Sequence, residues 1–428
     1  MTENIKPTKA RYTILAAVFI NVVINYMDRS NISVGASFIS EELGLTTIQV
    51  GYLFSAFGLA YALSQIPGGY LADKLNIRYF YSFCLITWSI ATVLQGFIYS
   101  FIILLVLRIF IGLFEAPSYP LNNRIITKWF PDNERAGAIA TYTSGQFIGL
   151  AFLTPALISI EHYLGWRALF YITGGIGMVW GVIWMFFYRD PSDSTKINEA
   201  ELLYIKNGGA LVNDTTSNKQ KDTVKFEWKN LKKVLTKRKL WGIYLGQFGL
   251  GATLMFFLTW FPKYLIDYKG MNFLQSGFTA SVPFIFAFFG VLFSGFISDY
   301  MAKKNVSVDI ARKTPVVVGL LLSTCIVGAN YTDNPFWVTF FMSVAFFGNG
   351  LASITWVFVS LIAPKELIGL TGGTFNFVGG LSAMIVPTAI GYLVSDGNFE
   401  PALIFISSLT LLAALSYIFL VGKVERIK

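Results

Sequence analysis

The sequence is poor in charge, histidine and cysteine. Of its 428 residues, 13% are charged and 54% are hydrophobic, whereas soluble domains carry about 25% charged residues. So few polar side chains cannot cover a water-exposed globule of this length, and we expect a polytopic membrane protein. The two cysteines, Cys84 and Cys325, stand in apolar stretches and predict no disulfide framework. A single histidine leaves no histidine-based metal site.

Long apolar runs are abundant instead. A helix needs about 20 mostly apolar residues to cross the hydrocarbon core of a bilayer, and twelve segments meet this requirement. The predicted spans are 12–35, 48–72, 79–97, 101–123, 136–160, 168–188, 241–264, 274–298, 314–331, 336–363, 368–395 and 401–422. They form two sets of six, 1–188 and 241–428, joined by a polar, lysine-rich stretch, 189–240. We therefore expect an all-α membrane protein with two pseudo-symmetric six-helix bundles and a cytoplasmic linker, which carries one or two short helices, for example near 198–207.

The lysines and arginines are distributed unevenly between the two sides of the predicted membrane. Of the 33 such residues, only Arg167, Lys263 and Lys269 fall in loops on one side, and Arg29 and Arg108 fall within spans. All the others lie on the side of the termini and the linker. Because basic residues concentrate in cytoplasmic loops, both termini are expected in the cytoplasm. This bias explains the net charge of +9 without a nucleic-acid partner.

A short signal occurs at matching places in the two halves. Gly69 and Asp73 follow the second span, and Gly295 and Asp299 follow the eighth, each pair with the spacing Gly-x-x-x-Asp. The glycine lets two helix ends approach, and the aspartate can accept hydrogen bonds from a neighbouring helix N-terminus. One copy is explained equally well as a capped helix end. Two copies at matching positions indicate an internal duplication.

The twelve spans, the central loop and the paired signals resemble the major facilitator superfamily. Within it, the chain resembles the anion:cation symporter family over nearly its whole length. The segments that carry this match are Asn-Tyr-Met-Asp-Arg at 25–29, Phe-Glu-Ala-Pro at 114–117 and Ala-Arg-Lys-Thr-Pro at 311–315. Segments similar to the D-galactonate:proton symporters of that family are 142–147, 347–350 and 371–377.

Four ionisable residues stand at membrane depth, namely Asp28, Arg29, Arg108 and Glu115. A mid-helix Asp or Arg costs about 2.5–3.5 kcal/mol on insertion scales, so each needs a partner or water. One interpretation is two neutralised ion pairs that lock helices together. The other is an anion site, because arginine stays charged and its planar fork suits a carboxylate, while buried acids can exchange protons near neutral pH. Fixed cations beside titratable acids are what a proton-coupled anion carrier requires.

The resemblance implies a role for each of these charges. Arg29 contacts the substrate anion, Asp28 and Glu115 carry protons, and Arg108 tunes Glu115. The candidates for contacts with substrate hydroxyl groups are the uncharged polar side chains Tyr26, Tyr61, Gln146, Gln247, Ser353, Thr355, Thr374 and Asn376. A hypothesis for the inner gate is that Asp73 pairs with a basic residue such as Arg135, with Asp299 as the counterpart of Asp73 in the second half.

The resemblance also implies the activity, which is proton-coupled import of a sugar-acid anion by alternating access, with D-galactonate as the expected substrate. An anion exchanger, or a symporter for another hexonate, glucarate or hexuronate, is the alternative. The sequence has no nucleophile–base pair, metal-ligand cluster or phosphate-binding loop, so we expect neither an enzyme nor a cofactor. The expected partners are the sugar acid, protons and the lipid of a bacterial inner membrane, and the protein is expected to be a monomer.

Overall fold

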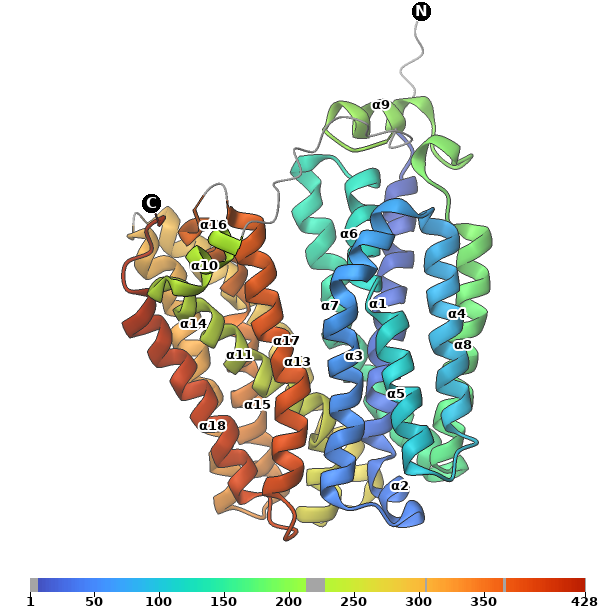
Figure 1. Cartoon of the computed structure of the whole chain (residues 1–428), viewed down its shortest axis with the longest axis vertical. Coiled ribbons are helices and arrows are strands. Elements are labelled where there is room, and N and C mark those ends of the chain that lie inside the picture. Colours follow the sequence, from blue (N-terminus) through green and yellow to red (C-terminus); the bar gives the residue numbers. More distant parts are fainter. Residues whose placement is uncertain (1–6, 213–227, 305, 365–366, 428) are drawn as a thin grey trace, which may run out of the picture.

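The computed structural model describes residues 7–212, 228–304, 306–364 and 367–427. This part of the chain is helical and contains no strand, and twelve of its helical segments are long and apolar enough to cross a membrane. The prediction of an all-α membrane protein is confirmed. Figure 1 shows two groups of helices standing side by side, with α9 (Glu199–Asn207) and α10 (Trp228–Thr236) at the same end of the molecule. We call this end the terminal face and the other end the opposite face.

The first group of helices contains the first six spans. Its helices are α1 (Ala10–Val34), α2 (Ala36–Leu43), α3 (Thr47–Lys74), α4 (Ile77–Gln95), α5 (Phe101–Glu115), α6 (Ser118–Trp129), α7 (Asp132–Leu164) and α8 (Trp166–Phe187). α2 is a short helix between the first two spans, and α5 and α6 together form the fourth. Within the group, α1 packs along α7, α3 along α5, and α4 along α8.

The second group contains the last six spans. Its elements are α11 (Arg238–Thr259), α12 (Phe261–Lys263), η2 (Tyr264–Tyr268), α13 (Phe273–Lys303), α14 (Val308–Ser323), η3 (Thr324–Tyr331), α15 (Pro335–Leu351), η4 (Ala352–Thr355), α16 (Trp356–Ile362), α17 (Ile368–Leu393), α18 (Glu400–Leu415) and η6 (Ser416–Val421). α13 packs along α15, and α11 packs along α17 and α18. The α13–α15 contact corresponds to α3–α5 of the first group, and the α11–α17 contact corresponds to α1–α7. In both halves, each of these spans is packed against another span of its own half.

The spans follow the apolar runs closely, but several ends differ from the prediction. The fourth span continues to Trp129 instead of ending at 123, because α6 extends it beyond a break at Pro117. Proline has no backbone N–H and cannot continue the hydrogen-bond ladder of a helix. The tenth span is interrupted by the tight turn η4. The expected short linker helix near 198–207 is found as α9, and Asn198 caps it by accepting a hydrogen bond from the Glu201 N–H.

The two groups touch through a seam near the opposite face. α3 lies along α17 and α7 along α13. Backbones approach closely at Gly51, where an added β-carbon would lie 2.8 Å from the Pro387 carbonyl oxygen. The hydrogen bonds between described residues of the two groups also lie here, among them Ser33 Oγ to the Thr259 carbonyl at 2.6 Å and Thr388 Oγ1 to Ser55 Oγ at 2.7 Å. Towards the terminal face the groups diverge (Figure 1).

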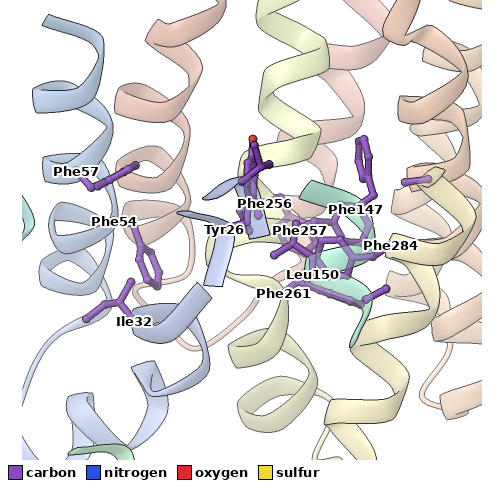
Figure 2. Packing of buried hydrophobic residues seen from close by; sticks show 14 of the residues in the cluster. Tyr26, Ile32, Phe54, Phe57, Phe147, Leu150, Phe256, Phe257, Phe261 and Phe284 are labelled. Carbon is purple, nitrogen blue, oxygen red and sulfur yellow. The ribbon is translucent and has the colours of Figure 1, made fainter. Parts of the chain in front are cut away.

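Aromatic side chains fill the middle of the seam. Figure 2 shows Phe147 of α7 close to Phe257 and Phe261 of the second group, with Phe284 of α13 beside them. The rings of Phe257 and Phe346 are stacked with centroids 4.1 Å apart, and Phe346 meets Phe147 edge-on at 6.3 Å. Packing of large apolar rings excludes water from this level of the protein. The seam is therefore closed on the side of the opposite face.

Hydrogen bonds and ion pairs hold α9 against the terminal face of the first group. Buried Glu201 accepts hydrogen bonds from Arg11 Nη1 at 2.8 Å and from the Ala10 N–H at 3.0 Å. The same arginine donates through Nε to Glu134 of α7 at 2.9 Å. Since one guanidinium joins α1, α7 and α9, this part of the linker is part of the first group.

Candidate substrate and proton site

The shortest ion pair between described residues of the first group joins α1 to α5. Arg29 Nε donates to Glu115 Oε1 at 2.5 Å. The Glu115 side chain is fully buried and that of Arg29 is 12% exposed. Arg29 Nη2 and Glu115 Oε2 are buried and have no hydrogen-bond partner among the described residues. These two atoms can still form hydrogen bonds with a polar ligand. Such bonds would be favourable, because an unsatisfied buried polar group costs about 1–3 kcal/mol, and more when charged.

Three aromatic rings surround the Arg29 guanidinium. Its central carbon lies 4.8 Å from the ring centroid of Tyr26, 4.6 Å from that of Tyr61 and 5.1 Å from that of Phe57. Such distances place the cation within the range of cation–π attraction. The rings restrict the directions from which another group can reach the guanidinium.

Arg108 stands two turns before Glu115 on α5 but does not pair with it directly. Its Nε donates to the Leu53 carbonyl of α3 at 3.4 Å, and its guanidinium lies 4.9 Å from the Phe57 ring centroid. Arg108 is 3% exposed, and its Nη1 has no hydrogen-bond partner in the part of the chain that the structure describes. Close packing of α5 on α3 is possible because a β-carbon at Gly112 would lie 2.5 Å from the Phe57 carbonyl oxygen. The glycine therefore lets Arg108 reach the Phe57 ring, which Arg29 contacts from α1.

The Asp28 side chain points in a different direction from that of its neighbour Arg29. Its Oδ2 accepts from Trp88 Nε1 of α4 at 2.9 Å, and its Oδ1 lies 3.5 Å from Asn31 Nδ2. Asn31 also donates to Thr173 Oγ1 of α8 at 2.6 Å. Consecutive helical residues are separated by about 100°, so Asp28 faces α4 and α8 while Arg29 faces α3 and α5. The described partners of Asp28 are neutral, and it is 3% exposed.

Polar groups for a hydroxylated ligand lie beside the arginine site. Tyr26 donates to Gln146 Oε1 of α7 at 2.7 Å, and the Tyr119 hydroxyl is 3.5 Å from both groups. The three side chains thus share hydrogen bonds across α1, α6 and α7. Tyr26 also covers Arg29, so this network continues directly from the charged pair.

The second group supplies uncharged groups, as predicted, in varied surroundings. Thr355 of η4 donates to Gln247 Oε1 of α11 at 2.9 Å. Thr374 donates to the Leu370 carbonyl of its own helix at 2.9 Å. Ser353 is half-buried and Asn376 is exposed. Gln247 and Thr355 are therefore fixed relative to each other, and the amide N–H groups of Gln247 stay available as donors.

The residues proposed for gating are placed less fully. Asp73 and Asp299 belong to α3 and α13, but their side chains lie outside what the structure describes. Arg135 Nη2 donates to the Gly209 carbonyl at 3.3 Å, beyond the end of α9. The gating hypothesis therefore stays a prediction. Among the described residues, no group of three or more His, Cys, Asp or Glu side chains is arranged to hold a metal ion.

Four residues around the charges were not predicted from the sequence. Trp88 and Asn31 hold Asp28, Phe57 contacts both arginines, and Tyr119 joins the Tyr26–Gln146 pair. From sequence alone, an aromatic residue in an apolar span is interpreted as part of the hydrophobic core. Only its contacts in the folded protein show that it also holds a charged side chain. Asn31 had a signal, since it is three residues from Asp28 and shares its helix face.

Comparison with known proteins adds a family to this geometry. Residues 18–387 match the Major Facilitator Superfamily. The chain belongs to this superfamily. It is a membrane transporter rather than an enzyme, and its sequence resembles transporters of sugar acids.

Two relatives are similar over almost their full lengths. The chain is 50% identical over 422 residues to a D-galactonate transporter of Escherichia coli O6:H1 (strain CFT073), covering 99% of this chain and 98% of the relative. It is 40% identical over 431 residues to a probable galactarate/D-glucarate transporter, GudP, of Escherichia coli K12, covering 99% and 96%. Sugar-acid transport is thus the common description of these relatives.

Solved structures share the fold. A bacterial homolog of the human lysosomal transporter Spinster, in an inward-facing and occupied conformation, is 20% identical with a TM-score of 0.74, covering 95% of this chain and 96% of that chain. A D-xylose–proton symporter is 14% identical with a TM-score of 0.73, covering 96% and 98%. At these identities the likeness concerns the arrangement of helices alone.

Proposed function

We propose that this transporter is a proton-coupled symporter that imports a sugar-acid monoanion, with D-galactonate as its substrate. The observation that carries the proposal is the buried Arg29–Glu115 pair, in which one guanidinium bonds a carboxylate at 2.5 Å and keeps an unpartnered Nη2. A substrate carboxylate can replace Glu115 on this guanidinium once Glu115 is protonated. Because Glu115 and the anion compete for one arginine, protonation of Glu115 favours anion binding, and anion binding favours protonation to the same extent.

The neighbouring polar groups suit the rest of a sugar acid. Tyr26 and Gln146 lie beside Arg29, and Gln247 with Thr355 present amide and hydroxyl groups from the second half. A polyol chain needs several donors and acceptors, each worth about 1 kcal/mol. The 50% identity to a protein named D-galactonate transporter supports this choice of substrate.

Asp28 is the second proton-binding residue in this proposal. It is buried between α1, α4 and α8, and its described partners Trp88 and Asn31 are neutral. A carboxylate at membrane depth without a cation beside it is costly in the charged form. Arg108, which lies close to Phe57 and two turns from Glu115 on the same face of α5, is the positive charge that tunes Glu115 in this proposal.

Transport would proceed by alternating access. The moving units are residues 1–188 and 241–428, joined by the linker 189–240, and the substrate site lies between them. The basic terminal face lies in the cytoplasm of a bacterium, with the protein working as a monomer in the inner membrane. In this orientation the closed seam faces outward, and the conformation is the one that releases sugar acid and protons inside.

The test is uptake of labelled D-galactonate into proteoliposomes with an imposed inward proton gradient. Wild type is compared with Asp28→Asn, Glu115→Gln and the matched control Glu161→Gln, which removes from α7 a buried carboxylate without a hydrogen-bond partner among the described residues. We expect accumulation by wild type and the control. Both site variants should lose gradient-driven accumulation, and Glu115→Gln should retain exchange of substrate across the membrane because Arg29 is then free for the anion.

Other results would contradict particular parts of the proposal. Exchange without gradient-driven accumulation in wild type would make the protein an anion exchanger. Inactivity with D-galactonate but uptake of galactarate or glucarate would move the substrate to the diacids named for the relative of 40% identity. Full accumulation by both site variants would remove Asp28 and Glu115 from the coupling mechanism.

A further inference from the structure

A group of cations at the terminal face of the second half lacks carboxylate partners among the residues that the structure describes. Arg238, at the start of α11, donates through Nη2 to the Phe419 carbonyl at 2.7 Å. Lys239 Nζ donates to the Lys423 carbonyl at 2.9 Å. Among the described residues neither cation, nor exposed Lys423, forms an ion pair. Carbonyl acceptors fix the position of a cation but leave its charge uncompensated, so this corner remains strongly positive.

The nearby acids do not neutralise the corner. Asp309 accepts from the Val424 N–H at 2.9 Å and lies 3.7 Å from Lys313, which gives it a cation of its own. Glu425 is exposed and forms no ion pair with a described residue. The positive charge of Arg238, Lys239 and Lys423 is therefore available to an anion from outside the protein.

An apolar groove begins next to these cations. It has a volume of about 410 Å³ and lies between α11 on one side and α18 with η6 on the other. Its walls include Leu245, Phe248, Leu412, Phe419 and Leu420. The rim is open, since Leu412 is 61% and Phe419 is 63% exposed. In Figure 1, α18 runs along the outer edge of the second group, where a membrane protein meets lipid.

The walls of the groove offer carbon and almost no hydrogen-bonding groups. The single hydroxyl on its lining, Ser416 Oγ, is turned into the protein, where it donates to the Gly242 carbonyl at 2.8 Å. A ligand in the groove therefore has to be apolar. Water or a sugar acid would lose hydrogen bonds there.

The groove and the cations are continuous. Phe419 lines the groove with its side chain and accepts the hydrogen bond of Arg238 with its carbonyl. On α11, Arg238 and Leu245 are seven residues apart, which places them on one helix face at a separation of about 10 Å along the axis. A ligand with an apolar chain in the groove has its polar end at the cations.

We propose that this corner binds an anionic phospholipid of the bilayer, with an acyl chain in the groove and the phosphate at Arg238, Lys239 and Lys423. Basic pockets between transmembrane helices on the cytoplasmic side are suited to such headgroups. A zwitterionic lipid carries its own cation and gains less from the three charges. The site lies on the membrane-facing surface of the second half, apart from the substrate site, and adds a lipid ligand to the proposed transport function.

The test measures bound lipid directly. The purified transporter is incubated with an equimolar mixture of phosphatidylglycerol and phosphatidylethanolamine of identical acyl chains, and retained lipid is measured by native mass spectrometry. Wild type should retain phosphatidylglycerol with a several-fold preference. The triple variant Arg238→Gln, Lys239→Gln, Lys423→Gln should bind the two lipids about equally. Glutamine can still donate to the carbonyls, so the backbone contacts are maintained and the variant is expected to fold.

A matched control removes the same amount of charge elsewhere. Lys196, Lys206 and Lys304 are exposed lysines on the terminal side of the chain, and their triple change to glutamine should leave the preference at the wild-type value. Leu245→Trp, which fills the groove, should reduce retention of both lipids. Equal preference in wild type and the Arg238 triple variant, or an equal loss in the control, would overturn the proposal. The readout does not involve transport, so failure of the lipid proposal can be distinguished from failure of the proposed symport.

Discussion

Gly58 of α3 and Ala383 of α17 meet so closely that a β-carbon added at Gly58 would lie 2.4 Å from the Ala383 carbonyl oxygen. The contact joins the two halves within the seam near the opposite face. No real β-carbon tolerates this distance, and the facing atom is backbone, which cannot move aside as a flexible side chain can. The closed seam thus requires glycine at this position.

We predict that Gly58→Ala opens the seam. Overpacking a tight contact costs about 1–3 kcal/mol, which changes the ratio of closed to open molecules by about 5- to 150-fold. Spin labels on cysteines replacing Glu41 and Asp396, two exposed residues of the opposite face, report the separation of the halves once Cys84 and Cys325 are serine. The distance distribution should shift to longer values.

The control for this change is Gly175→Ala on α8. A β-carbon at Gly175 would have no atom within 4 Å, so the distances should equal those of the parent. An unshifted distribution in Gly58→Ala would show that the seam adjusts to the extra carbon, and the argument from close packing would be wrong.

Trp88→Phe should destabilise the protein and reduce uptake. The change keeps a ring in the core but removes the N–H that bonds Asp28 Oδ2 at 2.9 Å. Leaving a buried carboxylate oxygen without this donor is expected to cost about 1–3 kcal/mol. Thermal unfolding in detergent measures the loss. Trp184→Phe is the matched control, because Trp184 is fully buried and its N–H has no described hydrogen-bond partner. Equal losses in the two variants would assign the effect to ring size alone.

Thr355→Val tests the polar groups of the second half. Valine has nearly the shape of threonine but cannot donate to Gln247 Oε1, so the amide loses its fixed orientation. We expect binding of D-galactonate to weaken about 3- to 10-fold, the loss for one hydrogen bond, as measured by isothermal calorimetry. The matched control is Thr410→Val, which removes a buried hydroxyl whose described acceptors are carbonyl groups of its own helix, α18. Unchanged affinity in Thr355→Val would place the polyol chain elsewhere.

Glu134→Gln should make stability less dependent on pH. Burial disfavours the charged form of Glu134, but hydrogen bonds from Arg11 and Tyr204 outweigh it and hold the pKa below its ordinary value. A carboxyl whose pKa is lowered by folding stabilises the protein above its unfolded pKa, and this contribution disappears as pH falls through the folded pKa. The variant should therefore unfold at a lower temperature at pH 7, by a change worth about 1 kcal/mol or less.

The difference between Glu134→Gln and wild type should shrink as the pH is lowered towards 4, because wild-type Glu134 is then increasingly protonated. Thermal scans between pH 4 and 8 follow it. Exposed Glu41, which forms no ion pair with a described residue, supplies the control Glu41→Gln. A gap between Glu134→Gln and wild type that stays constant with pH would contradict a stabilising role for the charged carboxylate.

The spans were predictable because each is a long run without charge, and the membrane requires little else of a helix. Breaks within spans were harder to predict from the sequence. Pro117 offered a signal for the break in the fourth span, but nothing comparable marks η4 in the tenth, where the turn tightens at Ala352–Thr355. Such a local change depends on the packing of neighbouring helices rather than on the residues of the turn.

The charged site was predictable in its members but not in its pairs. Asp28 and Arg29 are adjacent in sequence, yet the first is held by Trp88 and the second by Glu115. Which acid meets which arginine depends on how α4 and α5 are turned around α1, and this is decided by contacts such as Gly112 on the Phe57 carbonyl. The sequence pattern predicts which residues share a face of one helix. It does not predict how one helix is rotated relative to another.

The seam has a consequence for the surroundings in which the transporter works. No ion pair joins described residues of the two halves, and the contacts there are close backbone approaches, edge-on rings such as Phe147 and Phe346, and hydrogen bonds such as Ser55–Thr388. Dissolved salt screens charges over about 8 Å at physiological strength and has little to act on in such contacts. The closure of the seam is thus expected to change little with salt concentration.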